Sequence, residues 1–395
     1  MSQDSPSPID DNAGADGPRK VGFRERIAHF TWAEFACTQS TGGIAIMLSL
    51  TPYQFHGLQT AGVVVFILNL VLIVILCTLM LIRFVLHPRT IKHSFVNPPE
   101  PYFFGSFWLS IATSIICMER FGVPHTGPWL VVTIRVLFWM YAAGTLIFTT
   151  AIWVVLSSKS PIKLLEMNPA MFLMIYNTML TGTVASGIVQ SQPPVQRLPI
   201  IVAGITYQGL GWIVSVVLMA WFVGSLMENG LGQPDQRPGL FIPVGSAGFA
   251  IVTIIGCARA IPQGYAYFAT HPQGKEILVV LADWTSIFLW LFAFWLFGVA
   301  FLVNLPTMIP IRNGRLQPRM RFTLSWWGMI FPNVGFVIAT GYIGEQLQSS
   351  AIKWVATVMT ILQFAVWLLD MCLHLKALVT GQIMWPGRDE DVPKS

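Results

Sequence analysis

Ten apolar stretches follow one another along this chain of 395 residues, and neighbouring stretches differ in composition. Each is about long enough to cross a bilayer as a helix, which takes roughly 20 apolar residues. Counted from the N-terminus, the odd stretches cover 30–50, 102–118, 169–191, 240–258 and 322–344, and the even ones cover 60–86, 129–156, 198–226, 277–304 and 351–379. The odd stretches hold 31 Gly, Ser and Thr residues in 103 positions, whereas the even ones hold 20 in 141.

This alternation predicts an all-α polytopic membrane protein with ten transmembrane helices. Small and hydroxylated side chains are typical of helices that pack closely or face a wet interior rather than lipid. We therefore expect the odd helices to line a pore and the even helices to surround them. Only 10% of the residues are charged, against roughly 25% in soluble domains. The expected division is a disordered cytosolic tail at 1–28, a transport domain at 29–380 and a cytosolic tail at 381–395.

The positive charges predict the orientation of this domain in the membrane. If the N-terminus is cytosolic, 17 of the 23 Lys and Arg residues fall on the inner side and 5 on the outer side, while Arg135 lies within a span. Cytosolic loops carry such an excess. An even number of spans places both termini on the same side, so both are predicted to be cytosolic.

Several classes of function are not indicated. The sequence contains no P-loop, no GxSxG and no HExxH motif, and its five cysteines lack CxxC spacing. We expect neither an enzyme nor a metal site nor a bound cofactor. The basic residues are scattered over loops and form no stripe, so a nucleic-acid partner is not expected either.

Small residues and one tryptophan on the odd stretches are candidates for a substrate pathway. Hydroxyl groups and exposed backbone N–H groups can replace part of the hydration shell of an anion. The alternative is close helix packing, which needs small residues and no ligand. The candidates are Ser40, Thr41, Gly42, Gly43, Ser110, Thr113, Thr181, Gly182, Thr183, Gly245, Trp327 and Gly328.

The ninth stretch carries the sharpest local signal, the run from Trp326 to Asn333 (WWGMIFPN). Pro332 removes a backbone hydrogen bond, so we expect the helix to kink near Phe331. A kink in a pore-lining helix directs Phe331 toward the axis, where a bulky aromatic ring closes the pore. The alternative is a packed aromatic residue beside an ordinary proline kink.

Three charged residues lie within even stretches, namely Arg135, Asp283 and Asp370. Charge inside a membrane usually marks a function or a pair. Arg135 is suited to bind a carboxylate, and the acids are suited to carry protons. Because all three lie on the predicted coat, the simpler hypothesis is an Arg–Asp pair that braces two outer helices. With these three residues on the outer helices, the predicted pore lining is almost uncharged. It would attract an anion with the dipoles of backbone and hydroxyl groups rather than with a positively charged side chain.

Longer motifs resemble the tellurite-resistance/dicarboxylate transporter family, and within it the fungal malic acid transport proteins. The resemblance covers essentially all of 29–380. Its motifs are Phe30–Trp32, Ser40–Gly43, Phe84–Pro88, Gly122–Leu130, Arg135–Trp139, Tyr141–Ala143, Ser191–Pro194, Ile200–Gly204, Gln208–Gly211 and Arg237–Gly239.

The resemblance implies ten helices in five hairpins around a pore, with a blocking Phe on the ninth helix that corresponds to Phe331. Family members, which include plant slow anion channels and a yeast sulfite efflux pump, imply trimers in which every subunit keeps its own pore. The first hypothesis is a plasma-membrane carrier or channel for malate, succinate and fumarate, with or without protons. The alternative is an inorganic-anion channel or sulfite pump. A third hypothesis is a multi-span receptor.

Overall fold

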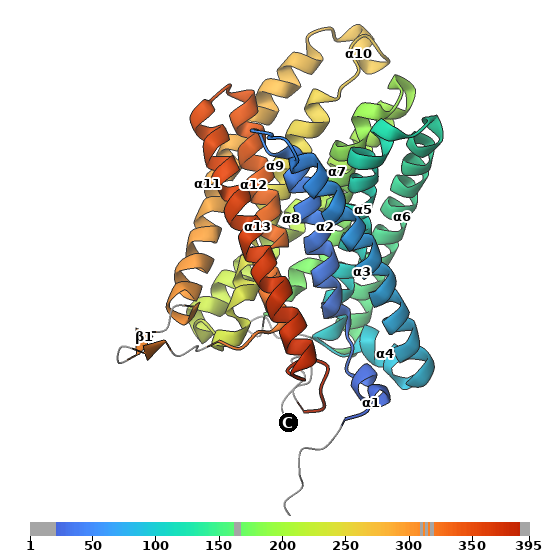
Figure 1. Cartoon of the computed structure of the whole chain (residues 1–395). Coiled ribbons are helices and arrows are strands. Elements are labelled where there is room, and N and C mark those ends of the chain that lie inside the picture. Colours follow the sequence, from blue (N-terminus) through green and yellow to red (C-terminus); the bar gives the residue numbers. More distant parts are fainter. Residues whose placement is uncertain (1–20, 162–166, 309–310, 313–314, 317–319, 388–395) are drawn as a thin grey trace, which may run out of the picture.

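Long helices standing side by side make up most of this protein (Figure 1). The computed structural model describes residues 21–161, 167–308, 311–312, 315–316 and 320–387. Within these residues, nine helical segments are long and apolar enough to cross a membrane. This confirms the prediction of a helical, multi-pass membrane protein.

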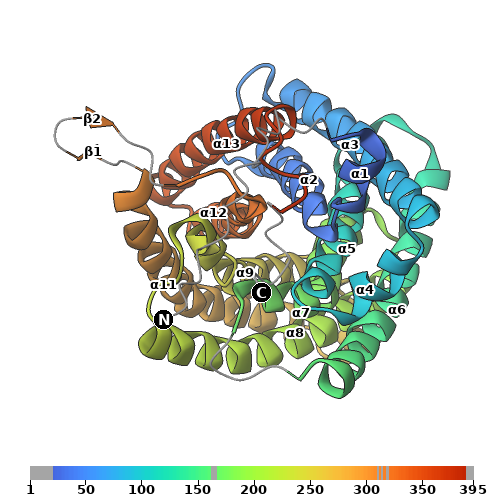
Figure 2. The same cartoon turned by 90° about the horizontal axis from the view of Figure 1, so that it is seen from below.

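The helices form an inner group enclosed by an outer group, as the view from below shows (Figure 2). The inner helices are α2 (Phe35–Leu50), α5 (Glu100–Cys117), α7 (Leu173–Ile188), α9 (Val244–Arg259) and α12 (Phe331–Gln346). The outer helices are α3 (Leu58–Leu86), α6 (Pro128–Lys159), α8 (Pro194–Asn229), α11 (Gly274–Met308) and α13 (Ser350–Val379). Each outer helix is longer than any inner one, and α2 is not among the nine candidate spans.

Short elements extend or connect these helices. The short α-helices are α1 (Phe23–Ala28), α4 (Arg89–Val96) and α10 (Tyr267–Thr270). The 3-10 helices are η1 (Trp32–Glu34), η3 (Val123–His125), η5 (Pro169–Phe172), η6 (Val189–Ser191), η7 (Pro234–Phe241) and η8 (Leu324–Met329), and η2 (Met118–Gly122) is a π-helix. Strands β1 (Ile311–Arg312) and β2 (Arg315–Leu316) pair antiparallel, with Ile311 opposite Leu316.

Burial follows the compositional alternation of the sequence. In the most apolar window of Pro169–Ser191, of Pro234–Arg259 and of Leu324–Gln346, 94% of the residues are buried inside the protein. The corresponding share in the five outer helices is between 17% and 33%. The outer helices expose large apolar side chains such as Phe288, which is 79% exposed. A continuous coat of exposed apolar side chains is stable only against lipid.

Glycine lets the inner helices approach one another at backbone distance. A Cβ atom on Gly105 of α5 would lie 2.2 Å from the carbonyl oxygen of Leu173 on α7. A Cβ atom on Gly248 of α9 would lie 2.6 Å from the backbone nitrogen of Phe336 on α12. Small residues at such crossings are the usual means by which membrane helices pack tightly.

The ninth span is broken rather than kinked, which corrects the prediction made from Pro332. The 3-10 helix η8 ends at Met329, and α12 begins at Phe331 with the proline in its first turn. Proline is favourable there, because its missing N–H would have no partner inside the helix. The Nε2 amide of Gln363 on α13 lies 2.9 Å from the carbonyl oxygen of Met329 and 3.2 Å from that of Ile330. These bonds tie α13 to the break, where Ile330 also accepts from the Val334 N–H at 3.0 Å.

The N-terminal boundary of the folded part lies earlier than predicted. Residues 1–20 are outside the described residues, but α1 falls within the stretch expected to be a disordered tail. The Ile27 side chain is fully buried in an apolar cluster with Phe30, Trp32 and Met80. The C-terminal segment also packs on the domain, since the Nε2 of Gln382 donates to the carbonyl oxygen of Phe322 at 2.8 Å.

We predict that Gly105→Ala destabilises the fold by about 1–3 kcal/mol, because α5 and α7 must separate to admit the methyl group. The measurement is the midpoint of thermal unfolding in detergent. The matched control is Gly209→Ala on the outer helix α8, where an added Cβ meets nothing within 4 Å. An unchanged midpoint for Gly105→Ala would show that the two helices are not held at backbone contact.

Candidate functional site

Two cavities lie among the inner helices. The larger, of about 380 Å³, lies where α8 ends and α7 begins, and its lining includes Gln39, Gly328 and Pro332. The smaller, of about 20 Å³, lies toward the opposite end, and its lining includes Gly43 and Phe331. The consecutive residues Phe331 and Pro332 therefore face different cavities.

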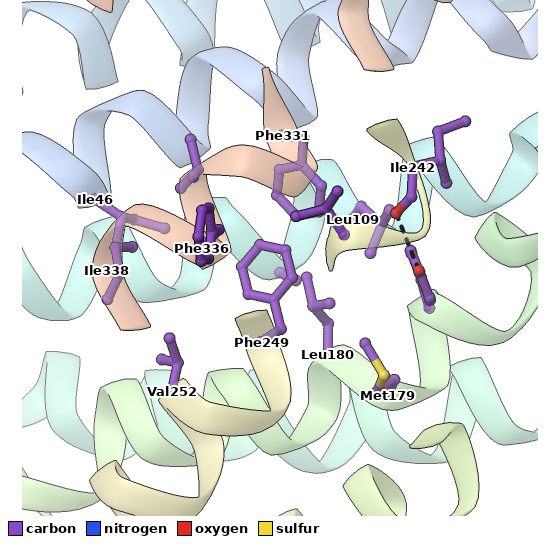
Figure 3. Close-up of a cluster of buried hydrophobic side chains, with 14 of the residues drawn as sticks. Ile46, Leu109, Met179, Leu180, Ile242, Phe249, Val252, Phe331, Phe336 and Ile338 are labelled. Carbon is purple, nitrogen blue, oxygen red and sulfur yellow. Dashed lines mark hydrogen bonds between the residues drawn. The ribbon is translucent and has the colours of Figure 1, made fainter. Parts of the chain in front are cut away.

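Phe331 and Phe249, called the aromatic plug below, face each other within a cluster of buried apolar side chains (Figure 3). Phe331 lines the smaller cavity, and the next residue, Pro332, lines the larger one. The Phe331 ring is 1% exposed. It stacks on the ring of Phe249 from α9, with ring centroids 4.9 Å apart and planes inclined by 30°. Opposite the ring lies Gly43 on α2, where an added Cβ would be 3.2 Å from the Phe331 ring. Stacked aromatic rings in a narrow passage exclude water and hydrated ions.

The break before α12 fixes the position of this plug. Phe331 is the first residue of α12, so its backbone direction is set by the turn through Ile330. Behind it, Pro332 packs against Gly245 on α9, where an added Cβ would lie 3.3 Å from the proline ring. The Asn333 side chain donates back to the carbonyl oxygen of Met329 at 2.9 Å.

The small-residue candidates separate into two groups. Those that line a cavity are Gly43, Thr113, Thr183 and Gly328. Gly42 and Gly182 instead mark packing contacts, since an added Cβ would lie 2.3 Å from the Thr113 hydroxyl in the first case and 2.8 Å from the Gln208 amide oxygen in the second. Gly245 packs on the proline of the plug.

The hydroxyl and indole candidates that line neither cavity are mostly engaged in hydrogen bonds between helices. The Ser110 hydroxyl lies 2.7 Å from that of Thr38, and the Trp367 indole donates to the Thr41 hydroxyl at 3.2 Å. The Ser40 hydroxyl donates weakly to the Trp327 carbonyl oxygen at 3.5 Å. Thr181 differs, because its buried hydroxyl has no hydrogen-bond partner in the described part of the chain.

Thr183 belongs to a short polar chain beside the smaller cavity. Its hydroxyl lies 3.2 Å from that of Thr253 on α9. The Thr253 hydroxyl in turn donates to the side-chain oxygen of Gln208 on α8 at 2.9 Å. This chain orients hydroxyl dipoles beside the pathway without placing a charge there.

Arg120 lines the smaller cavity, although it was not among the site residues predicted from the sequence. The π-helix η2 carries it inward, two residues beyond the predicted end of the third span. Its Nε atom is buried without a hydrogen-bond partner among the described residues. Wide π-turns often occur at functional sites, so the π-helix is the feature of the fold that marks Arg120 as a candidate. The lining thus contains a cation, contrary to the expectation of an almost uncharged passage.

The predicted Arg–Asp brace does not form in the described part of the structure. Asp283 accepts a bond from the Gln346 amide at 2.7 Å, and Gln346 accepts one from Arg259 at 2.8 Å. Arg135 on α6 forms neither an ion pair nor a hydrogen bond within those residues, and Asp370 has no hydrogen-bond partner for either carboxylate oxygen. Arg135 is half-buried on the outer helix α6, whereas Asp370 is fully buried on α13, so the two side chains do not pair.

A buried polar cluster joins α13 to the segment before the plug. The Nε2 atom of His374 lies 3.1 Å from a carboxylate oxygen of Glu34, and the indole N–H of Trp327 donates to His374 Nδ1 at 3.0 Å. His374 was not a sequence candidate. More than 300 residues separate it from Glu34, so no local pattern could have paired them.

Comparison with known proteins assigns the family. Residues 29–375 match the family model described as a voltage-dependent anion channel. The chain belongs to this family. The assignment confirms the family that the sequence motifs indicated.

Its relatives are named as transporters. The malic acid transport protein of Schizosaccharomyces pombe is 32% identical over 94% of this chain and 83% of its own length. A putative malic acid transport protein of the same organism is 33% identical over 95% of this chain and 86% of its own length. A sulfite efflux pump of Arthroderma otae is 24% identical over 90% of this chain and 93% of its own. These names agree with the prediction that the chain is not an enzyme.

Proposed function

We propose that this protein transports C4-dicarboxylate anions, namely malate and also succinate or fumarate, through a pore that Phe331 closes. The observation that carries the proposal is the aromatic plug of Phe331 and Phe249 beside two cavities, in a chain similar over most of its length to malic acid transport proteins. The proposed pathway residues are the cavity-lining Gly43, Thr113, Thr183 and Gly328, together with the plug.

The proposed topology has ten spans, with α2 and the preceding η1 as the first. Together they cover the segment from Trp32 to Leu50, which is short but lies wholly among the inner helices (Figure 2). Five hairpins then pair each inner helix with the outer helix that follows it. Polar backbone is tolerated at membrane depth where protein surrounds it, so a short inner span is stable in this position.

We place both chain ends in the cytosol of a cell and the protein in the plasma membrane. Helix α1 and the end of α13 lie at the same end of the molecule (Figure 1). An Arg26 guanidinium nitrogen donates to the Leu378 carbonyl oxygen at 2.7 Å, which holds the two segments together. The excess of Lys and Arg on this side supports a cytosolic location.

The electrostatics favour passage rather than tight binding. In this mechanism Arg120 draws a carboxylate into the outer mouth, and the Thr113 and Thr183 hydroxyls replace part of its hydration shell. Displacement of the Phe331 ring then joins the two cavities. Each charge moved through the membrane potential contributes about 2.3 kcal/mol per 100 mV, so a negative interior drives the dianion outward.

An inorganic-anion channel or sulfite pump is the second candidate. The similarity to a sulfite efflux pump and the family description favour it. The deciding experiment measures uptake of radiolabelled malate, sulfite and chloride by liposomes that contain the purified protein. Malate flux above that of empty vesicles supports the first proposal, whereas sulfite or chloride flux without malate flux supports the second. Binding of malate without flux would indicate a receptor.

We predict that Phe331→Ala raises anion flux by about tenfold or more, because removal of the ring opens the narrow passage. The flux is measured in liposomes or as current in a planar bilayer. The control is Phe288→Ala on the outer face of α11, where the side chain is exposed to lipid. If Phe331→Ala leaves the flux of every anion unchanged, Phe331 is not the gate.

We predict that Arg120→Gln raises the KM for malate by about tenfold, equivalent to roughly 1.4 kcal/mol, because a charge-assisted contact to the carboxylate is lost. The matched control is Arg135→Gln, which removes an arginine that contacts no acid among the described residues. Equal KM values for wild type and Arg120→Gln would remove Arg120 from the pathway.

We further propose that the protein forms a homotrimer in which every subunit keeps its own pore. The proposal follows from the resemblance to the transporter family, and the cavities among the inner helices of each subunit are compatible with it. Native mass spectrometry of the protein in detergent tests the number of subunits.

A further inference from the structure

The buried cluster of Glu34, Trp327, Asp370 and His374 lies outside the pathway and contains three groups that can bind a proton. Glu34 is 2% exposed, His374 7% and Asp370 fully buried. They come from η1 and α13, which meet beside η8. Ionisable groups inside a membrane protein are costly, and they are retained where they pair or carry a proton.

The hydrogen bonds define the protonation state of His374 in this conformation. Trp327 has only an N–H donor, so His374 Nδ1 must accept and can carry no proton. The Nε2 atom then carries the ring proton and donates it to the Glu34 carboxylate. The ring is therefore a neutral imidazole held between a donor and an acceptor.

A second proton on His374 would break one of these bonds. An imidazolium carries N–H groups on both nitrogens, so Nδ1 could no longer accept from the Trp327 indole. Asp370 lies four residues before His374 on α13, and residues at this spacing are neighbours on a helix. Both of its carboxylate oxygens lack a hydrogen-bond partner among the described residues. Asp370 can thus accept a hydrogen bond from the new N–H at Nδ1. The neutral ring cannot make this bond, because its Nδ1 carries no proton.

The lost bond would release the segment that carries the plug. Trp327 is fully buried in η8, four residues before Phe331. Its indole forms a hydrogen bond to His374 on α13. Gln363 on the same helix donates to the carbonyl oxygens of Met329 and Ile330. Loss of the indole bond removes one of the hydrogen bonds that fix η8 and the following residue Ile330 to this helix.

We propose that Glu34, Asp370 and His374 form a proton-binding site, and that its protonation frees Trp327 and opens the Phe331 gate. While the His374 ring is neutral, it holds Trp327 and the pore stays closed. When the ring takes up a second proton, its new N–H donates to Asp370 and the bond to Trp327 is lost. The proposal rests on the gate of the proposed function, but it does not depend on which anion is carried.

Few other ionisable groups surround the site. The Cys37 thiol of α2 lies beside the His374 ring and also donates to the Met371 sulfur at 3.7 Å. Lys376 follows on α13 but is exposed. The η8 segment contributes no ionisable side chain, since its sequence is LSWWGM. The charge at the site is therefore set by Glu34, Asp370 and His374.

The test measures anion flux in liposomes at equal pH on both sides, between about pH 5 and pH 8, where histidine changes its charge. Equal pH removes any proton gradient, so a response reports the gate and not coupled transport. Malate is supplied at a constant concentration of its dianion. Chloride is the second anion, because its charge does not change with pH and its flux tests the site even if malate is not carried.

We expect wild-type flux of the permeant anion to rise by about tenfold as the pH falls over this range. His374→Gln should give low flux without pH dependence, because the glutamine amide can accept from Trp327 and donate to Glu34 but binds no proton. Trp327→Phe should give high flux at every pH, because the ring is kept and the N–H is lost. The control His271→Gln changes an exposed histidine and should keep the wild-type profile.

Asp370→Asn provides a further measurement that does not rely on either of those variants. It replaces the carboxyl group that can accept from the protonated ring by an amide, which is a weaker acceptor and cannot ionise, so the rise in flux should shift to lower pH. Wild-type flux that does not change with pH would overturn the proposal, as would an unaltered profile in His374→Gln. Pore flux of chloride without malate would instead overturn the substrate assignment and leave the proton site standing.

Discussion

The position of the plug depends on the hydrogen bonds that satisfy a broken helix inside the membrane. At the junction of η8 and α12, the Met329 carbonyl group accepts its hydrogen bonds from side chains, whereas the Ile330 carbonyl group also accepts from the Val334 N–H at 3.0 Å. The bilayer offers no water to bind a carbonyl group that has no such partner. The Gln363 amide of α13 donates to both carbonyl groups. The outer helix α13 thus stabilises the backbone geometry that makes Phe331 the first residue of α12. The same helix carries His374, so the bonds that hold the aromatic plug and the proposed proton-binding site share one helix.

Much of the fold can be predicted from the sequence, because the bilayer restricts what an apolar chain can form. Length and composition alone locate the helices to within a few residues at most ends. The distribution of small residues anticipates which helices are buried, since close approach such as that of Gly105 to Leu173 tolerates no side chain. The break at Ile330 was harder to predict, because a proline in mid-span predicts a kink equally well. The bonds that stabilise a full break include two from Gln363, which is distant in the sequence.

The candidate site could be predicted only in part, for a physical reason. A residue type reports what a side chain can do, whereas its neighbours decide what it does. Gly43 and Gly42 are adjacent and identical in sequence, yet one faces the plug and the other packs on Thr113. Arg120 enters the cavity because η2 turns inward. His374 and Glu34 meet across almost the whole chain, a pairing that tertiary packing alone creates.

The placement of charge in the proposed pathway is suited both to the selection and to the release of a dianion. A cation within the narrowest part would bind the anion tightly and slow its exit, since conduction needs sites that are favourable to enter yet weak enough to leave. In the proposed pathway the constriction is made of Phe331 and Phe249, while Arg120 lies in the lining of the smaller cavity beside it. The buried acids Glu34 and Asp370 are not among the residues that line either cavity. In the proposed mechanism, protons act on the gate through Trp327, and no carboxylate is needed in the lining of either cavity.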